Sequence, residues 1–414
     1  MNRLAVFLLL MLLGPGCVSL PDSPPTPATA GEAAAGGEAA RHLMVTLRPA
    51  PPGLLDQLTY ELAEIYALQP VAAWQIQSLG RRCVVFESRN LLAGRRLETL
   101  LRSLRGDHRV DLAQAVQRFS TLAEGQAAVA GSYRHLQHGA DTLHLEAAHQ
   151  LATGRGVKVA VVDTGVDLTH PELQGRILAA KDFAARRLEK VPRGEGDLFT
   201  HDLHGTAVAG VIAAASDGVG TLGVAPEAGI LALKACWARS PGDRQASCDS
   251  YTLSLALDFA LGEGAQVINL SWSGPPDPIL EALVAAALER GAVVVAALGA
   301  PDSFPARLPG VIAVRSLEGP EDGSAAEAGS FAAPGEEILS TVPGGGYDFF
   351  SGSSLAAAEV SGIAALMLEK KQDLGPAGVA ELLRKTARDN PGRAAVDACA
   401  PLAALAAGGA GCER

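Results

Sequence analysis

Three short stretches carry an aspartate, a histidine and a serine that together could attack a carbonyl group. Ser354 follows Gly352-Ser353 and opens an apolar run to Lys370, so it lies in the first turn of a predicted helix. Unpaired backbone N–H groups there favour an anion, so a serine can attack a carbonyl while its own N–H holds the oxyanion. Alone, the pattern also fits a serine that only caps the helix.

Asp163 and His204 are the side chains such a serine needs. Asp163 directly follows the run 159–162, which is typical of a buried parallel strand. Catalytic groups gather at the carboxyl ends of such strands. His204 precedes Gly-Thr-Ala-Val-Ala-Gly, a small-residue run that predicts a helix packed closely on a sheet. Separately, the aspartate could cap a turn and the histidine could fill a core. Together with Ser354 they predict a hydrolytic triad.

The elements around these residues alternate between strands and helices. Strand runs are predicted at 157–162, 230–234, 267–270, 292–296 and 311–314, and helical runs at 142–152, 204–214, 251–261, 278–290 and 355–370. This alternation predicts an α/β fold with a doubly wound, mostly parallel sheet covered by helices on both faces. With 414 residues, 48% of them hydrophobic, the chain is long enough for one large core and a smaller domain.

The three stretches resemble the active-site signatures of the subtilisin-like (subtilase) serine peptidases. The matching runs are Val-Val-Asp-Thr-Gly-Val-Asp at 161–167, His-Gly-Thr-Ala-Val-Ala-Gly at 204–210 and Ser-Gly-Ser-Ser-Leu-Ala-Ala at 351–357. The resemblance extends from about residue 143 to 405. It implies that Asp163 orients the histidine, that His204 acts as general base and then acid, and that Ser354 is the nucleophile.

The resemblance also assigns the substrate cleft. One edge would be Ser271, Trp272, Ser273 and Gly274, where an extended peptide adds as a strand, and Ala297 and Gly299 would line the cleft as well. The family's oxyanion-binding asparagine is replaced by Ala300, which leaves the backbone N–H of Ser354 as a donor. In subtilisin itself, losing that asparagine lowers turnover about 10²–10³-fold.

These residues predict a serine endopeptidase that hydrolyses protein or peptide substrates through an acyl-enzyme. Ala300 keeps two alternatives open. One is a pseudopeptidase that binds peptides or acts as a scaffold, and the other is a peptidase limited to cutting its own chain, where the tethered substrate has a high effective concentration.

The N-terminus predicts export to a bacterial cell envelope. A basic start, an apolar run over 4–13 and Gly14-Pro15-Gly16-Cys17 resemble a lipoprotein signal over residues 1–17, with Cys17 lipidated and anchoring the protein to a membrane. Ordinary signal cleavage near 28–30 is the alternative. Residues 18–40 are rich in Pro, Ala and Gly and predict a tether.

Residues 41–135 predict a small α+β domain, which precedes a peptidase domain at 136–414. This domain resembles subtilase propeptides, which act as folding chaperones and as inhibitors whose C-terminal tail occupies the cleft. An N-terminal domain that is never removed is the alternative. Residues 41–135 carry a net charge of +4 and residues 136–414 a net charge of −13. Opposite charges favour docking of the two domains, and the negative large domain argues against nucleic-acid binding.

Cysteine positions predict two local disulfides in an exported chain. Cys236 and Cys248 flank a polar insertion, and Cys399 and Cys412 bracket the C-terminal tail. Four free thiols are the alternative. The sequence has no zinc spacing and no phosphate-binding loop, so we expect no required cofactor. Subtilases often bind structural calcium, but the sequence alone assigns no ligands to it here.

Overall fold

The computed structural model divides the chain into two units, 1–38 and 39–414. It describes residues 40–92, 94–122, 124–127, 133–188, 203–238, 243–299, 303–319, 329–390, 393–406 and Cys412. Cys17, Ala300 and nearly all of the predicted tether lie outside the described residues. Within the described ranges, no helix combines the length and apolar character that crossing a membrane requires.

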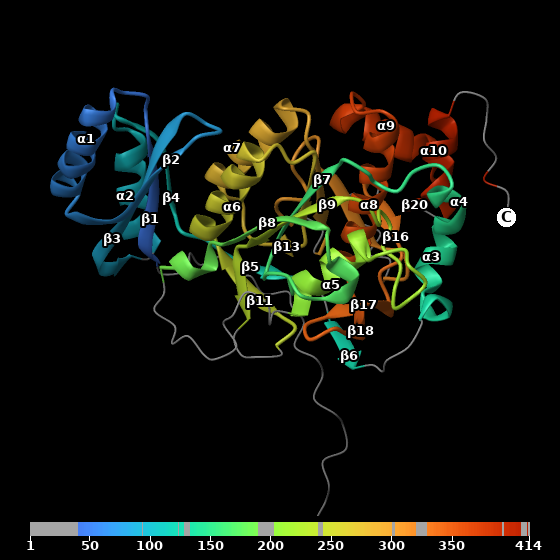
Figure 1. Ribbon diagram of the computed structural model, residues 1–414. Coiled ribbons are helices and arrows are strands. Elements are labelled where there is room, and N and C mark those ends of the chain that lie inside the picture. The colour runs from blue at the N-terminus through green and yellow to red at the C-terminus, as the bar shows by residue number, and fades with distance from the viewer. Residues whose placement is uncertain are drawn as a thin grey trace, which may run out of the picture. The chain divides into compact units, whose positions relative to one another are not determined.

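The described residues form a nine-stranded sheet at the centre of the large domain (Figure 1). In sheet order its strands are β19 (Arg388–Asn390), β20 (Arg393–Ala395), β16 (Phe331–Ala333), β15 (Ile312–Ser316), β14 (Val293–Ala297), β12 (Val267–Leu270), β7 (Lys158–Asp163), β9 (Gly229–Lys234) and β8 (Ile177–Asp182). All neighbouring strands are parallel except the edge pair β19 and β20. The predicted doubly wound, mostly parallel fold is confirmed.

Helices cover both faces of this sheet because its strands bury side chains on both sides. Val159 and Val161 of β7 pack with α5 (Leu203–Ala213) and α8 (Ser353–Lys370). Ala160 and Val162 pack with α6 (Ser250–Gly262) and α7 (Pro278–Glu289). Since successive strand residues point to opposite faces, strands covered on both sides are apolar throughout. Two further helices, α9 (Gly375–Thr386) and α10 (Cys399–Leu405), complete the C-terminal part.

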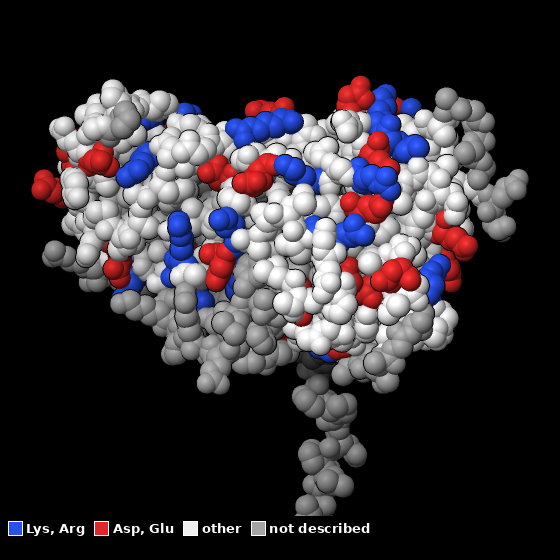
Figure 2. Space-filling view, viewed as in Figure 1, with Lys and Arg blue, Asp and Glu red and all other residues white. Residues whose placement is uncertain are grey.

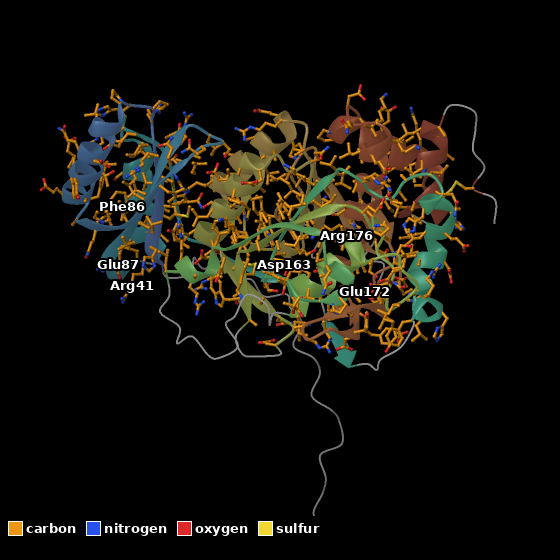
Figure 3. The ribbon with its side chains drawn as sticks, viewed as in Figure 1. Arg41, Phe86, Glu87, Asp163, Glu172 and Arg176 are labelled. Carbon is orange, nitrogen blue, oxygen red and sulfur yellow. A yellow bond between two sulfur atoms is a disulfide. The ribbon has the colours of Figure 1, made fainter. Side chains whose placement is uncertain are left out.

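The N-terminal domain is a four-stranded antiparallel sheet with two helices. Its elements are β1 (Ala40–Leu47), α1 (Pro52–Ile65), β2 (Leu68–Ile76), β3 (Arg81–Leu92), α2 (Gly94–Arg105) and β4 (Val110–Ala115), with strand order β2-β3-β1-β4. Leu43 and Phe86 belong to the core shared with both helices. Arg41 and Glu87, labelled in Figure 3, form an ion pair of 3.8 Å between the paired strands β1 and β3.

The other face of this small sheet packs on the large domain. Met44 and Val85, which alternate with the residues facing α1 and α2, share a core with α6 and α7. The ring centroids of Trp74 and Tyr251 lie 5.0 Å apart. Figure 2 shows acidic and basic side chains interspersed over one face of the molecule, so opposite net charges do not appear there as two separate surfaces.

Two smaller sheets lie beside the large one. The first has the order β10 (Cys236–Ala238), β11 (Ala246–Asp249), β5 (Arg118–Thr121) and β13 (Trp272–Ser273). The second has the order β17 (Ile338–Val342), β18 (Gly346–Ser351) and β6 (Glu124–Ala127). Both predicted disulfides, Cys236–Cys248 and Cys399–Cys412, are present in the structure, and Cys83 is free and buried.

One predicted helix is wrong in its extent. The run 142–152 forms two short helices, α3 (His138–Thr142) and α4 (Leu145–His149), rather than one. His144 between them has φ of 54°, in the left-handed region, and its Nδ1 lies 2.7 Å from Asp397 Oδ2. A left-handed residue cannot continue a right-handed helix, so the long-range contact with Asp397 accompanies a break that the local sequence does not show.

Candidate active site

Asp163 and His204 form a buried hydrogen-bonded pair. Asp163 is the last residue of β7 (Figure 3), and its Oδ1 lies 2.7 Å from His204 Nδ1. The same oxygen accepts a hydrogen bond of 2.7 Å from the backbone N–H of Thr164. The aspartate is 1% exposed and the histidine 3%. This contact fixes the ring and leaves His204 Nε2 with no hydrogen-bond partner among the described residues, as a general base requires.

A close backbone approach sets the position of His204. The backbone N–H of Gly205 donates to Thr164 Oγ1 at 3.0 Å. A Cβ at residue 205 would clash with the carbonyl oxygen of Gly165, so only glycine lets α5 begin this close to the turn that follows β7. The motif glycine therefore brings the histidine to the aspartate.

Ser354 lies in the first turn of α8 and is fully buried. Gly352, with φ of 137°, turns the chain into the helix, a conformation that side chains disfavour. Ser354 Oγ donates to the carbonyl oxygen of Ser271 at 3.2 Å, and Ser271 Oγ donates back to the carbonyl oxygen of Ser354 at 3.2 Å. The serine hydroxyl is therefore not bonded to His204 here, and its Oγ must rotate to reach that base. Catalytic hydrogen bonds often form only in the substrate complex.

Asn269 and Ser361 were not predicted as site residues, yet they hold this arrangement. Asn269 Nδ2 donates to Ser271 Oγ at 2.8 Å, and Ser361 Oγ donates to Asn269 Oδ1 at 2.9 Å. All of these side chains are buried. Asn269 is a polar residue within the otherwise apolar strand run 267–270, and this was the signal in the sequence that could have identified it as a site residue.

The predicted cleft edge at 271–274 lies against the chain's own segment Arg118–Leu122, which we call the docked segment. Its strand β5 pairs antiparallel with β13 on one side and with β11 on the other. Gly274 contacts this segment closely, because a Cβ there would clash with Phe119. Ala297 is buried at the end of β14, and a Cβ on Gly299 would lie 3.1 Å from Leu122 Cδ1.

The docked segment also meets the nucleophile. The backbone N–H of Ser354 donates to the carbonyl oxygen of Leu122 at 3.4 Å. This N–H is the predicted oxyanion donor, and the bond would strengthen as negative charge develops on the carbonyl oxygen. The propeptide resemblance predicts that the tail of the N-terminal domain lies in the cleft, but it did not identify Leu122 as the residue that meets Ser354.

A polar bridge joins β18 to the insertion that precedes β11. Arg244 Nη2 lies 2.5 Å from Asp348 Oδ2, and the guanidinium carbon lies 5.1 Å from the centre of the Phe350 ring. Asp348 is 5% exposed. Because the disulfide Cys236–Cys248 joins paired positions on β10 and β11, it holds the base of this insertion. The sequence predicted the disulfide but not the bridge.

Glu359 carries an unpaired buried carboxylate five residues after the nucleophile. It is 4% exposed, and its Oε2 has no partner among the described residues. Burial, and secondarily the charge of Glu318, raises the pKa of Glu359 well above its ordinary 4.5. The folded state therefore holds this proton more tightly than the unfolded chain does.

We expect Glu359→Gln to raise the melting temperature at pH 8. Because the folded-state pKa is raised, the wild type loses stability as pH rises above about 4.5, whereas glutamine does not titrate. The difference between the two proteins should therefore shrink as pH falls toward 4. Thermal unfolding followed by circular dichroism at several pH values measures it, with the exposed Glu146→Gln as control. A difference that does not change with pH would contradict this explanation.

Across the described ranges, no group of three or more His, Cys, Asp and Glu side chains is placed to hold a metal ion. The geometry instead gathers a base with an orienting carboxylate, a serine at a helix N-terminus and a peptide carbonyl. This set of groups suits acyl transfer.

Comparisons with known proteins agree with this geometry. A model of the subtilase family matches residues 154–400. Subtilisin E from Bacillus subtilis (strain 168) is 35% identical over 264 residues, which are 60% of this chain and 65% of that protein. An intracellular serine protease from Paenibacillus polymyxa is 33% identical over 247 residues, 56% of this chain and 72% of that protein.

The fold also resembles the crystal structure of fervidolysin from Fervidobacterium pennivorans, described as a keratinolytic enzyme related to subtilisin. The TM-score is 0.70 at 24% identity, over 89% of this chain and 61% of that one. Since the family match covers more than half of the residues, this chain belongs to the subtilase family of subtilisin-like serine proteases.

Proposed function

We propose that the protein is an exported serine endopeptidase that hydrolyses peptide bonds through an acyl-enzyme on Ser354. The observation that carries this proposal is the hydrogen bond from the Ser354 N–H to the carbonyl oxygen of Leu122. It places a peptide carbonyl at the amino end of α8, where the nucleophile lies. The hydrogen-bonded Asp163–His204 pair supports the same proposal.

In this mechanism, Ser354 Oγ attacks the substrate carbonyl carbon while His204 Nε2 takes its proton. Asp163 keeps the ring in the tautomer that leaves Nε2 free and stabilises the imidazolium that forms. The Ser354 N–H holds the oxyanion, and His204 then returns its proton to the leaving amine. Water, activated by the same histidine, hydrolyses the ester and restores the serine.

Export and lipid anchoring of Cys17 belong to the proposal on sequence grounds, because a basic start, an apolar run and a small-residue break precede this cysteine. The wild type should incorporate labelled palmitate and Cys17→Ser should not. Equal incorporation by Cys17→Ser would exclude Cys17 as the lipid anchor.

We propose that the N-terminal domain acts as an inhibitor docked on the peptidase domain. Gln114 of β4 donates to Asp277 Oδ2 at 2.6 Å and accepts from the Ile279 N–H at 3.1 Å. The backbone N–H of Ser78 donates to Asp258 Oδ1 at 2.8 Å. Burial raises the pKa of Asp277, and hydrogen bonds from Ser250 and others oppose that rise. Gln114 thus supplies hydrogen bonds to a carboxyl group and a helix end that are shielded from water.

We expect Gln114→Ala to weaken this docking by about 2 kcal/mol, roughly 30-fold, because Asp277 Oδ2 and the Ile279 N–H each lose one buried hydrogen bond. In the Ser354→Ala background, where the chain stays intact, amide hydrogen exchange in β5 and β11 should rise by that factor. The exposed Gln57→Ala on α1 is the matched control. Unchanged exchange in Gln114→Ala would show that these contacts do not hold the domain.

Labelling with a serine-directed phosphonate tests the proposed function. The wild-type chain should gain one adduct, in the tryptic peptide 316–370, and Ser354→Ala should gain none. Gln114→Ala is labelled in parallel, because its loosened N-terminal domain exposes the serine even if the wild-type domain stays docked. No adduct in either protein would overturn the peptidase proposal. It would favour a peptide-binding pseudopeptidase, the alternative that the replacement of the oxyanion-binding asparagine by Ala300 supports.

A further inference from the structure

The hairpin of β10 and β11 forms one wall of the cleft that holds the docked segment. On one side β11 pairs with β5, which is labelled beside it in Figure 1, and Ser247 faces Ser120. On the other side β11 pairs with β10, where Ser247 faces Trp237. The disulfide Cys236–Cys248 joins the neighbouring paired positions, which keeps β10 in register with β11. Trp237 is therefore held in place with only β11 between it and the docked segment.

The small sheet of β10, β11, β5 and β13 has two different faces. Side chains directly opposite each other in paired strands share a face, and successive residues of one strand alternate between faces. Phe119 lies on the inner face, where its ring is 5.2 Å from that of Trp272. Arg118, Ser120 and Trp237 accordingly lie on the outer face, and Ser120 is exposed. The docked segment thus directs Arg118 toward the indole rather than toward the core.

Arg118 reaches Trp237 across this outer face. Its guanidinium carbon lies 5.7 Å from the centre of the indole ring, within the range of a cation–π interaction. A second cation, Arg187, lies 5.6 Å from the same ring. Trp237 is 5% exposed, so these contacts are largely shielded from water. Because tryptophan attracts cations more strongly than the other aromatic residues do, this ring is suited to bind a guanidinium group.

Asp249 supplies a negative charge beside the same position. It faces Arg118 across the paired strands β11 and β5 and is 2% exposed. Burial raises the pKa of Asp249, and hydrogen bonds from Thr252 and the charge of Arg118 oppose that rise. The like charge of Arg187 acts against a second cation, whereas Asp249 and the net charge of −13 on residues 136–414 favour one.

The register of the docked segment places this contact at a defined distance from the nucleophile. The carbonyl oxygen of Leu122 accepts from the Ser354 N–H at 3.4 Å. Phe119 is 3% exposed and fills the inner face, and a buried apolar side chain specifies register strongly. Arg118 lies four residues before Leu122. A substrate bound in the same register would therefore place the fourth residue before its cut residue on Trp237.

We propose that Trp237 forms an extended substrate subsite that selects an arginine four residues before the residue whose carbonyl Ser354 attacks. This inference rests on the proposed function and names its substrate class, namely extended peptide segments with a cation at that position. The docked segment fills the subsite with Arg118. Lysine should bind there less tightly than arginine, because a planar guanidinium group stacks on an aromatic ring and an ammonium group does not.

Peptide binding tests the subsite without requiring catalysis. Ser354→Ala protein is folded as the full chain and is then freed of its N-terminal domain by limited proteolysis. Isothermal titration calorimetry measures its affinity for the acetylated peptide Arg-Phe-Ser-Thr-Leu, which is the sequence of residues 118–122. The comparison peptide carries citrulline, which has the shape of arginine but no charge. We expect the arginine peptide to bind about tenfold more tightly.

Trp237→Leu, made in the same Ser354→Ala protein, separates the indole from the overall negative charge. It keeps an apolar side chain on β10, so the preference for arginine should fall below about threefold. Ser247→Ala is the matched control, since Ser247 lies on the same face between Trp237 and the docked segment, and it should keep the tenfold preference. If Trp237→Leu does not fold, Trp237→Phe replaces it and should lower the affinity for the arginine peptide alone.

Two binding results would overturn the subsite. The first is equal affinity of the Ser354→Ala protein for the two peptides. The second is an arginine preference that stays above threefold in folded Trp237→Leu, because the overall charge would then explain it.

Hydrolysis separates a failed subsite from a failed function. The wild type, prepared in the same way, is given both peptides as p-nitroanilides, and kcat/KM should be about tenfold higher for arginine. Equal kcat/KM for the two anilides would overturn the subsite and leave the peptidase standing. An arginine preference in binding, with neither anilide hydrolysed, would overturn the peptidase and leave Trp237 as part of a peptide-binding site.

Discussion

Replacing either Ser354 or His204 by alanine should lower kcat for peptide hydrolysis about 10⁶-fold. Triad members act as a unit, so the loss of the nucleophile or of the base removes nearly all chemistry beyond binding and the oxyanion contact. The double variant should be no slower than either single variant. The measurement is hydrolysis of a peptide with the sequence of residues 118–127, after each variant has folded with the N-terminal domain and that domain has been removed.

Two further variants test whether the loss of activity is specific to the nucleophile and the base. Asp163→Asn should lose about 10⁴-fold, less than the other two, because the histidine remains but in the wrong tautomer. Ser353→Ala, beside the nucleophile, should stay within tenfold of the wild type. If Ser354→Ala kept more than a hundredth of the wild-type rate, Ser354 would not be the nucleophile.

Replacing Ala300 by asparagine should raise kcat about 10²–10³-fold. The resemblance places residue 300 where subtilisins carry an oxyanion-binding amide, and the Ser354 N–H alone makes a long bond of 3.4 Å to the Leu122 carbonyl. A side-chain N–H aimed at the developing charge would supply roughly 3–4 kcal/mol of transition-state stabilisation. KM should change little, because the ground-state carbonyl gains less than the oxyanion does.

Ala300→Asp is the matched control, since it has nearly the shape of asparagine but repels an oxyanion. It should lower kcat below the wild-type value. If asparagine leaves kcat unchanged while aspartate lowers it, another hydrogen-bond donor already stabilises the oxyanion. The hypothesis that Ala300 weakens the oxyanion hole would then be wrong. Steady-state kinetics on the 118–127 peptide separates the two cases.

The sequence predicted the large sheet and the triad positions because both depend on local patterns. An apolar run ending in Asp163 marks a strand end, and the glycines near His204 and Ser354 mark close approaches and turns. Parallel strands then bring these ends to one edge of the sheet. The predicted triad roles follow from the family resemblance, and the activity itself stays a proposal.

What the sequence did not predict depends on pairing between distant segments. The propeptide resemblance predicts a tail in the cleft, but the residues that meet Ser354, 118–122, are set by strands from three separate regions, and no local periodicity encodes such pairing. Nothing in the sequence indicates that Gln114 and Asp277 form a hydrogen bond. The break at His144 likewise arises beside a contact with a residue near the C-terminus. Strong local patterns thus predicted the large sheet and the triad positions, whereas the identity of the segment beside Ser354 depends on long-range contacts.

Multiple-turnover hydrolysis tests the central claim most directly, because it separates an endopeptidase from a chain that cuts only itself. Wild-type protein freed of its N-terminal fragment is mixed with a hundredfold excess of the 118–127 peptide, and products are followed by mass spectrometry. We predict that all of the peptide is cut after the residue corresponding to Leu122, and that a Ser354→Ala peptidase domain likewise freed of the N-terminal domain cuts none. Peptide left intact by a folded wild type that lacks the fragment would contradict the claim.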